Sequence, residues 1–390
     1  MTATLQSRAS ATAATRVVDE IRRSGPMRFD RFMDRALYDP RDGYYERTVE
    51  QIGRKGDFYT SVSVGSLFGE LLAFIFAARL EEIRAGKARL WLVEAGAHDG
   101  RLAADILGWF RLWRPADWSG LDYGIVEPSP ARRAIQRRRL GAFAGKVHWF
   151  GSLAELKGAR PSGVLFSNEL LDALPLRRFV WRRAGGAGCW RESGVGLAAD
   201  DTSFIWSESE VPIEEWEASP WLAVGRERLR ELEPVLPTGF VWEHPAGAVG
   251  WWAEAANCLS QGWLVALDFG RADGLPALPE RGEGSLRAFR GHHQVADVLA
   301  NPGGQDLTAD VDFDLIRRVG EAAGLRTAAL CPQGRWFGEW LARVEAAVQR
   351  GAFPVWDAVR RRGLLTLVHP EHLGSRFQVL IQERTSCSEP

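Results

Sequence analysis

Acidic and amide side chains directly follow three short apolar runs that resemble β-strands. Glu94 and a glycine-bearing turn, 96–100, end the first run, and Glu127 ends the second. Asn168 and Glu169 end a later one. The carboxyl ends of parallel strands meet at one edge of a sheet, where open α/β folds bind ligands. We therefore expect these groups to form one ligand site.

The turn and Glu127 together suit a nucleoside-containing ligand. Such a ligand needs bare backbone after the first strand and an acceptor for its ribose hydroxyls after the second. A dinucleotide loop requires glycine at its first, third and sixth positions, which here hold Gly96, His98 and Arg101. A methyltransferase loop has glycine at its first, third and fifth positions, and here Gly96 and Gly100 match. The spacing favours an adenosyl cofactor, and an ordinary strand–turn–helix corner is the alternative.

The segment 167–175 places Asn168, Glu169 and Asp172 where the crevice is expected to open. Carboxylates there could orient a nitrogen that accepts a methyl group and could favour its less protonated form. The alternative is a helix start capped by Asn168 or Glu169.

A loop with Gly56, Asp57, Phe58 and Thr60 precedes an apolar helix at 67–83. Its composition suits a lid that folds over a ligand. A turn with core aromatics is the alternative.

A late excursion, 270–311, carries several His and Asp residues but no known zinc spacing, so we predict no metal. Asp306 and Thr308 are instead expected to cap a helix that begins near Val311.

Strands and helices alternate along most of the chain, which predicts a parallel, doubly wound α/β sheet. Helices are expected within 12–40, over 67–83, from Gly100 through Leu107 and over 130–140. Strands are expected at 90–93, 123–126, 146–150, 163–166, 262–267 and 377–381. We predict five segments: an N-terminal helical segment with the lid (1–85), a cofactor-binding core (86–184), an insertion (185–240), the rest of the core with the loop 270–311 (241–333) and a C-terminal segment (334–390).

The composition is that of an ordinary globular chain, with 390 residues, 46% hydrophobic and 25% charged. The formal net charge of -1 gives no reason to expect nucleic acid as a partner. Four scattered cysteines predict neither disulfides nor a zinc site and favour a cytoplasmic location. No secretory signal or membrane span is expected.

These segments, taken in order, resemble the MidA family, the bacterial relatives of the mitochondrial complex I assembly methyltransferase. The matching stretches are Phe32-Met33, Ala36–Pro40, Gly43–Tyr45, Gly56–Phe58 with Thr60, Leu67–Glu70, Val126–Pro130, Asn168–Pro175, Asp268–Gly270, Asn301–Gly303, Asp306–Thr308 and Val311–Phe313.

The resemblance implies a Rossmann-like class I methyltransferase core with N-terminal helices and inserted substrate-covering elements. It implies that Glu94, Gly96, Ala97 and Gly100 hold the methionine end of S-adenosylmethionine. It also implies that Glu127 with Pro128 holds the ribose, that Ser152 and Leu153 flank the adenine, and that the lid, Asn168 and Glu169 complete the cofactor site.

The resemblance implies a protein as substrate, with an arginine side chain as the favoured acceptor, and leaves an oligomer open. Arginine stays protonated in water, so Glu169, Asp172 and Asp268 would orient it and take its proton.

Three departures from the family pattern leave alternatives open. His98 stands at a glycine position of the turn, Val62 and Ser63 replace the Pro-Glu of the lid, and Phe269 replaces a tyrosine. A catalytically inactive assembly or scaffold protein and a small-molecule methyltransferase are the principal alternatives. A nicotinamide oxidoreductase is disfavoured by the turn spacing.

Overall fold

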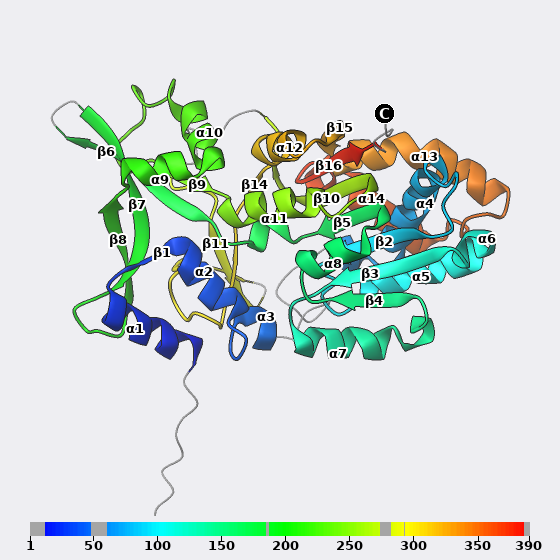
Figure 1. Cartoon of the computed structure of the whole chain (residues 1–390), viewed down its shortest axis with the longest axis horizontal. Coiled ribbons are helices and arrows are strands. Elements are labelled where there is room, and N and C mark those ends of the chain that lie inside the picture. The colour runs from blue at the N-terminus through cyan, green and yellow to red at the C-terminus, as the bar shows by residue number, and fades with distance from the viewer. Residues whose placement is uncertain (1–11, 48–60, 185–186, 274–281, 292, 386–390) are drawn as a thin grey trace, which may run out of the picture.

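The computed structural model describes residues 12–47, 61–184, 187–273, 282–291 and 293–385 (Figure 1). The predicted lid residues Gly56, Asp57, Phe58 and Thr60 therefore lie outside the described residues. Among the described residues, no helix has both the length and the apolar character needed to cross a bilayer.

The core is a sheet of eight strands (Figure 1). In spatial order they are β15 (Arg326–Pro332), β16 (Phe377–Arg384), β10 (Gln261–Arg271), β5 (Ser162–Asn168), β2 (Leu90–Ala95), β3 (Leu121–Val126) and β4 (Val147–Phe150), with β14 (Val311–Asp312) paired to the end of β10. The five strands from β10 to β4 are parallel, and β16 lies antiparallel between β10 and β15. The predicted α/β sheet and its six predicted strands are confirmed.

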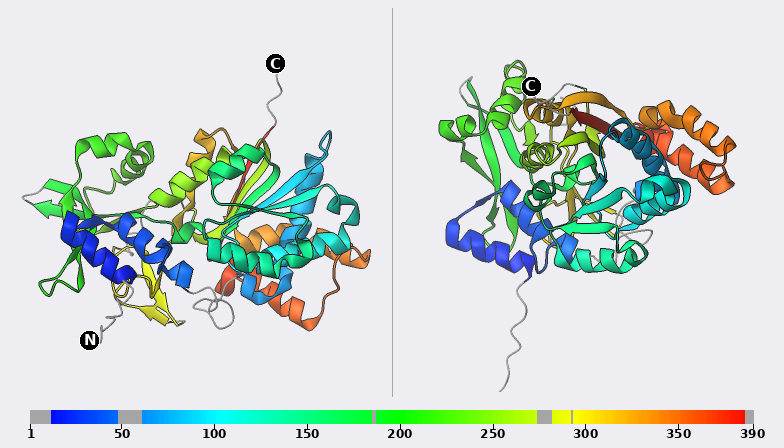
Figure 2. Two further views of the ribbon diagram at one scale, coloured as in Figure 1. Left: turned by 60° about the horizontal axis from the view of Figure 1, so that its bottom comes forward. Right: turned by 45° about the vertical axis from the view of Figure 1, so that its right-hand side comes forward.

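Helices cover both faces of this sheet, which explains why its strands are continuous apolar runs. Figure 2 shows the two layers. One face packs against α4 (Ser66–Glu82), α5 (Arg101–Trp113) and α13 (Gln333–Gln349). The other packs against α8 (Leu153–Ala159), α11 (Ala246–Ala256) and α12 (Phe313–Ala322). The remaining helices of this half are α6 (Pro115–Trp118), α7 (Pro130–Arg139) and α14 (Ala358–Val368).

The strand order contains a change of direction at the edge where the ligand site is expected. From β2 the chain proceeds outward through β3 and β4, and it then returns to β5 on the other side of β2. Such a switch in direction opens a crevice beyond the carboxyl ends of the two central strands. The ends of β2, β3 and β5 carry the side chains singled out from the sequence.

A second, antiparallel sheet stands beside the core (Figure 1). It contains β1 (Met27–Arg28), β7 (Ala187–Leu197), β6 (Arg177–Ala184) and β9 (Val241–His244), with β8 (Phe204–Glu210) paired to β7. Helices α1 (Ala13–Ser24), α2 (Phe29–Tyr38), α9 (Ile213–Ala218) and α10 (Pro220–Leu229) accompany it. Because β6 and β9 belong to this sheet, it extends beyond both ends of the predicted insertion 185–240. The predicted segment boundaries stay predictions.

The late excursion forms a small three-stranded sheet of β11 (Arg287–Arg290), β12 (His293–Val295) and β13 (Asp306–Thr308). The expectation that Asp306 and Thr308 cap a helix is wrong, because both pair with β11. Asp312 caps α12 instead, with its Oδ1 accepting from the Leu315 amide at 3.0 Å.

Candidate active site

The turn after β2 has three residues in the left-handed backbone region. They are Gly96 (φ 72°), His98 (φ 47°) and Gly100 (φ 80°), and Gly100 is the N-cap residue of α5. A Cβ atom at Gly96 would lie 3.1 Å from the Leu170 side chain. Glycine at 96 is therefore favoured by the backbone conformation, and a larger residue would press on the Leu170 side chain. His98 adopts the same conformation despite its side chain, at a cost of about 1–2 kcal/mol.

Glu127 lies beside this turn. The side-chain amide of Gln136 donates to the His98 carbonyl at 2.9 Å and to Glu127 Oε2 at 3.1 Å. The Ser129 amide donates to Glu127 Oε1 at 3.0 Å. Burial raises the pKa of Glu127 above its usual value. The structure therefore places Glu127 next to the turn 96–100, and these are the two parts of the predicted cofactor site.

Glu94 faces the apolar layer below the turn. Its Oε2 accepts from the Tyr123 hydroxyl at 2.7 Å, and burial raises its pKa to about 8. A cation bound nearby would favour its ionised form.

The other predicted cofactor residues lie around the same edge. Ala97 is buried, and Pro128 is exposed. Ser152 caps α8 by accepting from the Glu155 amide at 3.2 Å. Leu153 packs in the core, so its backbone rather than its side chain borders the edge.

Glu169 follows the end of β5 with a strained backbone (φ 53°). Its Oε1 accepts from Asn168 Nδ2 at 3.0 Å and from the Ser61 amide at 3.3 Å. Burial, reinforced by the nearby Asp172, raises the pKa of Glu169 to about 8. The short helix that follows has no side-chain cap from Asn168 or Glu169. The capping alternative is therefore wrong.

Asp268 holds this segment in place. It is fully buried; its Oδ2 accepts from the amides of Leu170 and Leu171 at 3.0 and 2.7 Å, and its Oδ1 from Phe269 at 2.9 Å. Backbone amides therefore contact both oxygens of Asp268 and hold it against the turn after β5. The expected role of Asp268 toward the acceptor stays a prediction, and burial raises its pKa to about 7.

Asp172 lies near Tyr38 and Tyr45, two residues that were not singled out as site residues from the sequence. Burial and the neighbouring carboxyl of Asp268 raise its pKa well above the usual value, and Asp306 adds to the effect. The hydroxyl of Tyr38 donates to the Ala173 carbonyl at 2.9 Å, and that of Tyr45 donates to Asp306 Oδ1 at 2.9 Å. The tyrosine rings stack at 5.4 Å. Both tyrosines belong to the stretches that carry the family resemblance, which was the available signal.

The profile of a family described as "Putative S-adenosyl-L-methionine-dependent methyltransferase" matches residues 71–331. That range is more than half of the chain. The chain belongs to this methyltransferase family.

Relatives and solved structures agree with this assignment. The mouse protein arginine methyltransferase NDUFAF7, mitochondrial, is 29% identical over 406 residues, covering 94% of this chain and 86% of the relative. The Xenopus tropicalis protein of the same name is 30% identical over 338 residues, covering 79% of this chain and 70% of the relative.

A COG1565 superfamily member from Burkholderia thailandensis, crystallised with S-adenosylhomocysteine, superimposes with a TM-score of 0.78. The two sequences are 27% identical, and the superposition covers 95% of this chain and 92% of the Burkholderia chain. The resemblance to the MidA family is confirmed. The enzyme is an S-adenosylmethionine-dependent methyltransferase with the expected fold.

The residues of this methyltransferase fit its cofactor. Within the described part of the chain, four buried polar atoms near the crevice have no partner: Ser167 Oγ, Asn168 Oδ1, His98 Nε2 and Arg132 Nη2. They come from segments that follow or end three neighbouring strands, and the turn and Glu127 lie among them. Glu127 and the backbone of residues 96–100 would hold the adenosyl and methionine parts. The assignments of individual residues stay predictions.

Proposed function

We propose that the methyl acceptor is an arginine side chain of a protein. One observation carries the proposal: carboxyl groups gather on the acceptor side of the crevice, where Glu169 and Asp172 follow β5 and Asp306 lies on β13. Burial, reinforced by neighbouring carboxyl groups, raises the pKa values of Glu169 and Asp172. A guanidinium ion bound beside them would favour their ionised forms. The relatives named protein arginine methyltransferases support the same acceptor.

S-adenosylmethionine, when bound, supplies a methyl group on a positively charged sulfur. The chain's residues then have to align the acceptor nitrogen and receive its proton. Glu169 suits this role, because Asn168 and the Ser61 amide fix only its Oε1. An adjacent guanidinium would favour its ionised form, and the proton lost by the nitrogen would pass to that carboxylate.

The test is a methylation assay with radiolabelled S-adenosylmethionine and whole-cell protein extract, followed by acid hydrolysis and separation of methylated amino acids. We expect label in methylarginine. We expect Glu169→Gln to abolish it and Glu339→Gln, a change at an exposed side chain of α13, to preserve it. Label only in methyl-lysine or in small molecules would overturn the proposal.

The family resemblance extends the proposal to a subunit of respiratory complex I as the acceptor protein. Identification of the labelled protein by mass spectrometry tests that extension. The cytoplasmic location stays a prediction from the cysteine pattern.

A further inference from the structure

Helix α3 (Tyr44–Arg47) lies between the cofactor side and the acceptor side of the site. Tyr45 contacts both. Its hydroxyl donates to Asp306 Oδ1 at 2.9 Å, and its carbonyl accepts from Arg132 Nε at 2.8 Å. The guanidinium carbon of Arg132 lies 5.3 Å from the centre of the Tyr45 ring.

The cofactor side of this contact leads directly to Glu127. Ser129 donates through its amide to Glu127 Oε1 at 3.0 Å and through its hydroxyl to Glu46 Oε2 at 2.8 Å. Glu127, which is expected to bind the ribose, and Glu46 of α3 therefore both accept hydrogen bonds from Ser129. Arg132, in the first turn of α7, is 6% exposed, and its Nη2 has no partner among the described residues. A ligand atom that reached Nη2 would act on the same side chain that holds Tyr45.

The acceptor side is equally well fixed. Asp306 Oδ1 also accepts from the Leu307 amide at 2.9 Å, at the start of β13.

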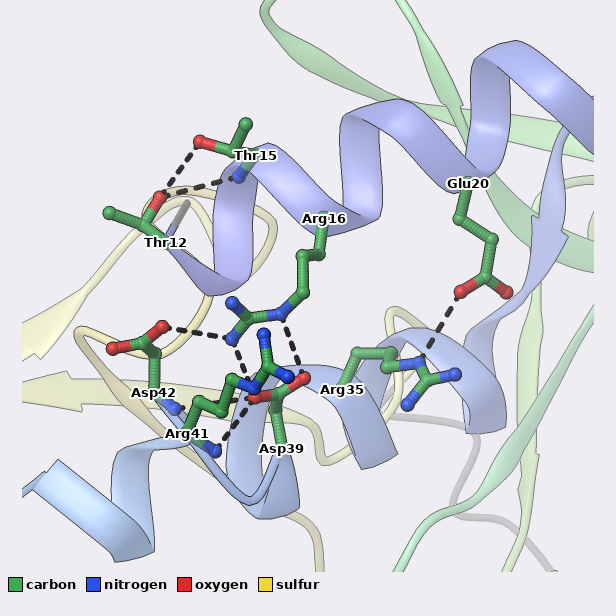
Figure 3. A network of polar contacts seen from close by, with 8 residues as sticks. All are labelled: Thr12, Thr15, Arg16, Glu20, Arg35, Asp39, Arg41 and Asp42. Atoms are coloured by element: carbon green, nitrogen blue, oxygen red, sulfur yellow. Dashed lines mark hydrogen bonds and ion pairs between the residues drawn. The ribbon is translucent and has the colours of Figure 1, made fainter. Parts of the chain in front are cut away.

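The turn 39–42 leads into α3 and is held by hydrogen bonds. Asp39, at the end of α2, accepts from Arg16 and from the amides of Arg41 and Asp42 (Figure 3).

Gly303 packs against this turn from the acceptor loop. A Cβ atom at Gly303 would lie 2.4 Å from the Asp42 carbonyl oxygen. The chain therefore enters α3 through a hydrogen-bonded turn that packs closely against the loop at Gly303.

We propose that Tyr45 is a positioning residue that couples occupancy of the cofactor site to the ordering of Asp306 on the acceptor side. The proposal rests on the proposed function, because it assigns Asp306 to the acceptor. Bound cofactor holds Arg132 and Ser129, these hold α3, and the Tyr45 hydroxyl holds the Asp306 carboxylate. Thermodynamic coupling is reciprocal, so acceptor binding tightens cofactor binding by the same factor.

The experiment uses S-adenosylhomocysteine as the probe and the full chain. Isothermal titration gives its affinity, and hydrogen exchange of the peptide containing residues 306–308 is measured with and without saturating probe. In the wild type we expect the probe to slow this exchange by about fivefold or more, the low end of typical site-to-site coupling. Tyr45→Phe should bind the probe yet lose most of this protection.

Tyr38→Phe is the matched control. It removes the hydroxyl of the stacked neighbouring ring, whose partner is the Ala173 carbonyl rather than Asp306. It should retain the protection at 306–308. Glu46→Ala is a second variant, which breaks the contact with Ser129 without altering the ring stack, and it should also weaken the protection. If Tyr45→Phe does not fold, the protection measured in Glu46→Ala tests the proposal in its place.

The outcomes distinguish a failure of the proposed function from a failure of the coupling role of Tyr45. If the wild type does not bind the probe, the proposed function fails. If the probe binds but leaves 306–308 unprotected, or protects them equally in the wild type, Tyr45→Phe and Glu46→Ala, the coupling role of Tyr45 is refuted and the proposed function stands.

Discussion

The turn after β2 makes a sharp prediction through Gly96→Ala. Gly96 has φ 72°, and a Cβ atom there would lie 3.1 Å from the Leu170 side chain. A non-glycine residue in the left-handed region costs about 1–2 kcal/mol. The lower chain entropy of alanine in the unfolded state returns about 0.4–1 kcal/mol. Contact with Leu170 adds to the cost, so we expect a net loss of about 1–2 kcal/mol of unfolding free energy.

The same change should weaken cofactor binding. Relief of the strain requires the turn or Leu170 to move, and both border the expected methionine site. If binding has to restore the native turn, about 1.4 kcal/mol corresponds to a tenfold weaker affinity for S-adenosylhomocysteine. Urea unfolding measures the stability, and isothermal titration measures the affinity.

Gly108→Ala is the matched control, because Gly108 lies in the helix that follows the turn and a Cβ atom there would meet nothing within 4 Å. Alanine is favoured over glycine inside helices by about 0.5–1 kcal/mol, so this variant should be more stable and bind normally. The reasoning is refuted if Gly96→Ala matches Gly108→Ala in both stability and affinity.

Three further outcomes follow from the site. At position 98, where φ is 47°, His98→Gly should be more stable than His98→Ala by about 1 kcal/mol in urea unfolding; equal stabilities would show that the backbone there is unstrained. Glu127→Gln should weaken S-adenosylhomocysteine binding by about tenfold or more, because hydrogen bonds to a charged acceptor contribute about 1.5–3 kcal/mol; titration showing wild-type affinity would remove Glu127 from the cofactor site. Glu169 has a pKa of about 8 in the folded chain against an ordinary 4.5, so the folded state holds the proton over that range and unfolding releases it. Stability should therefore fall as pH rises from about 4.5 through 8, and thermal unfolding of Glu169→Gln should show a weaker decline; an identical decline would contradict the raised pKa.

The sequence alone determined the core sheet and the edge at which the site lies. Glu94, Glu127 and Glu169 each follow a short apolar run. Parallel strands that are buried on both faces appear in a sequence as continuous apolar runs rather than as an alternating pattern, so these runs identified the strands. Because parallel strands end at a common edge, local pattern was enough to bring these residues together. The glycine spacing of the turn was likewise a local property.

The hydrogen-bond partners of Asp268 and Tyr45 were decided by tertiary structure. The sequence suggested Asp268 as a proton acceptor at a strand end; in the structure its Oδ2 accepts from two amides of the turn after the neighbouring strand β5, and its Oδ1 accepts from the amide of Phe269 in its own strand. Tyr45 and Asp306 are 261 positions apart, and no sequence period relates them. Hydrogen bonds between distant segments depend on how the two sheets and their connecting helices pack, and that packing is a property of the whole chain.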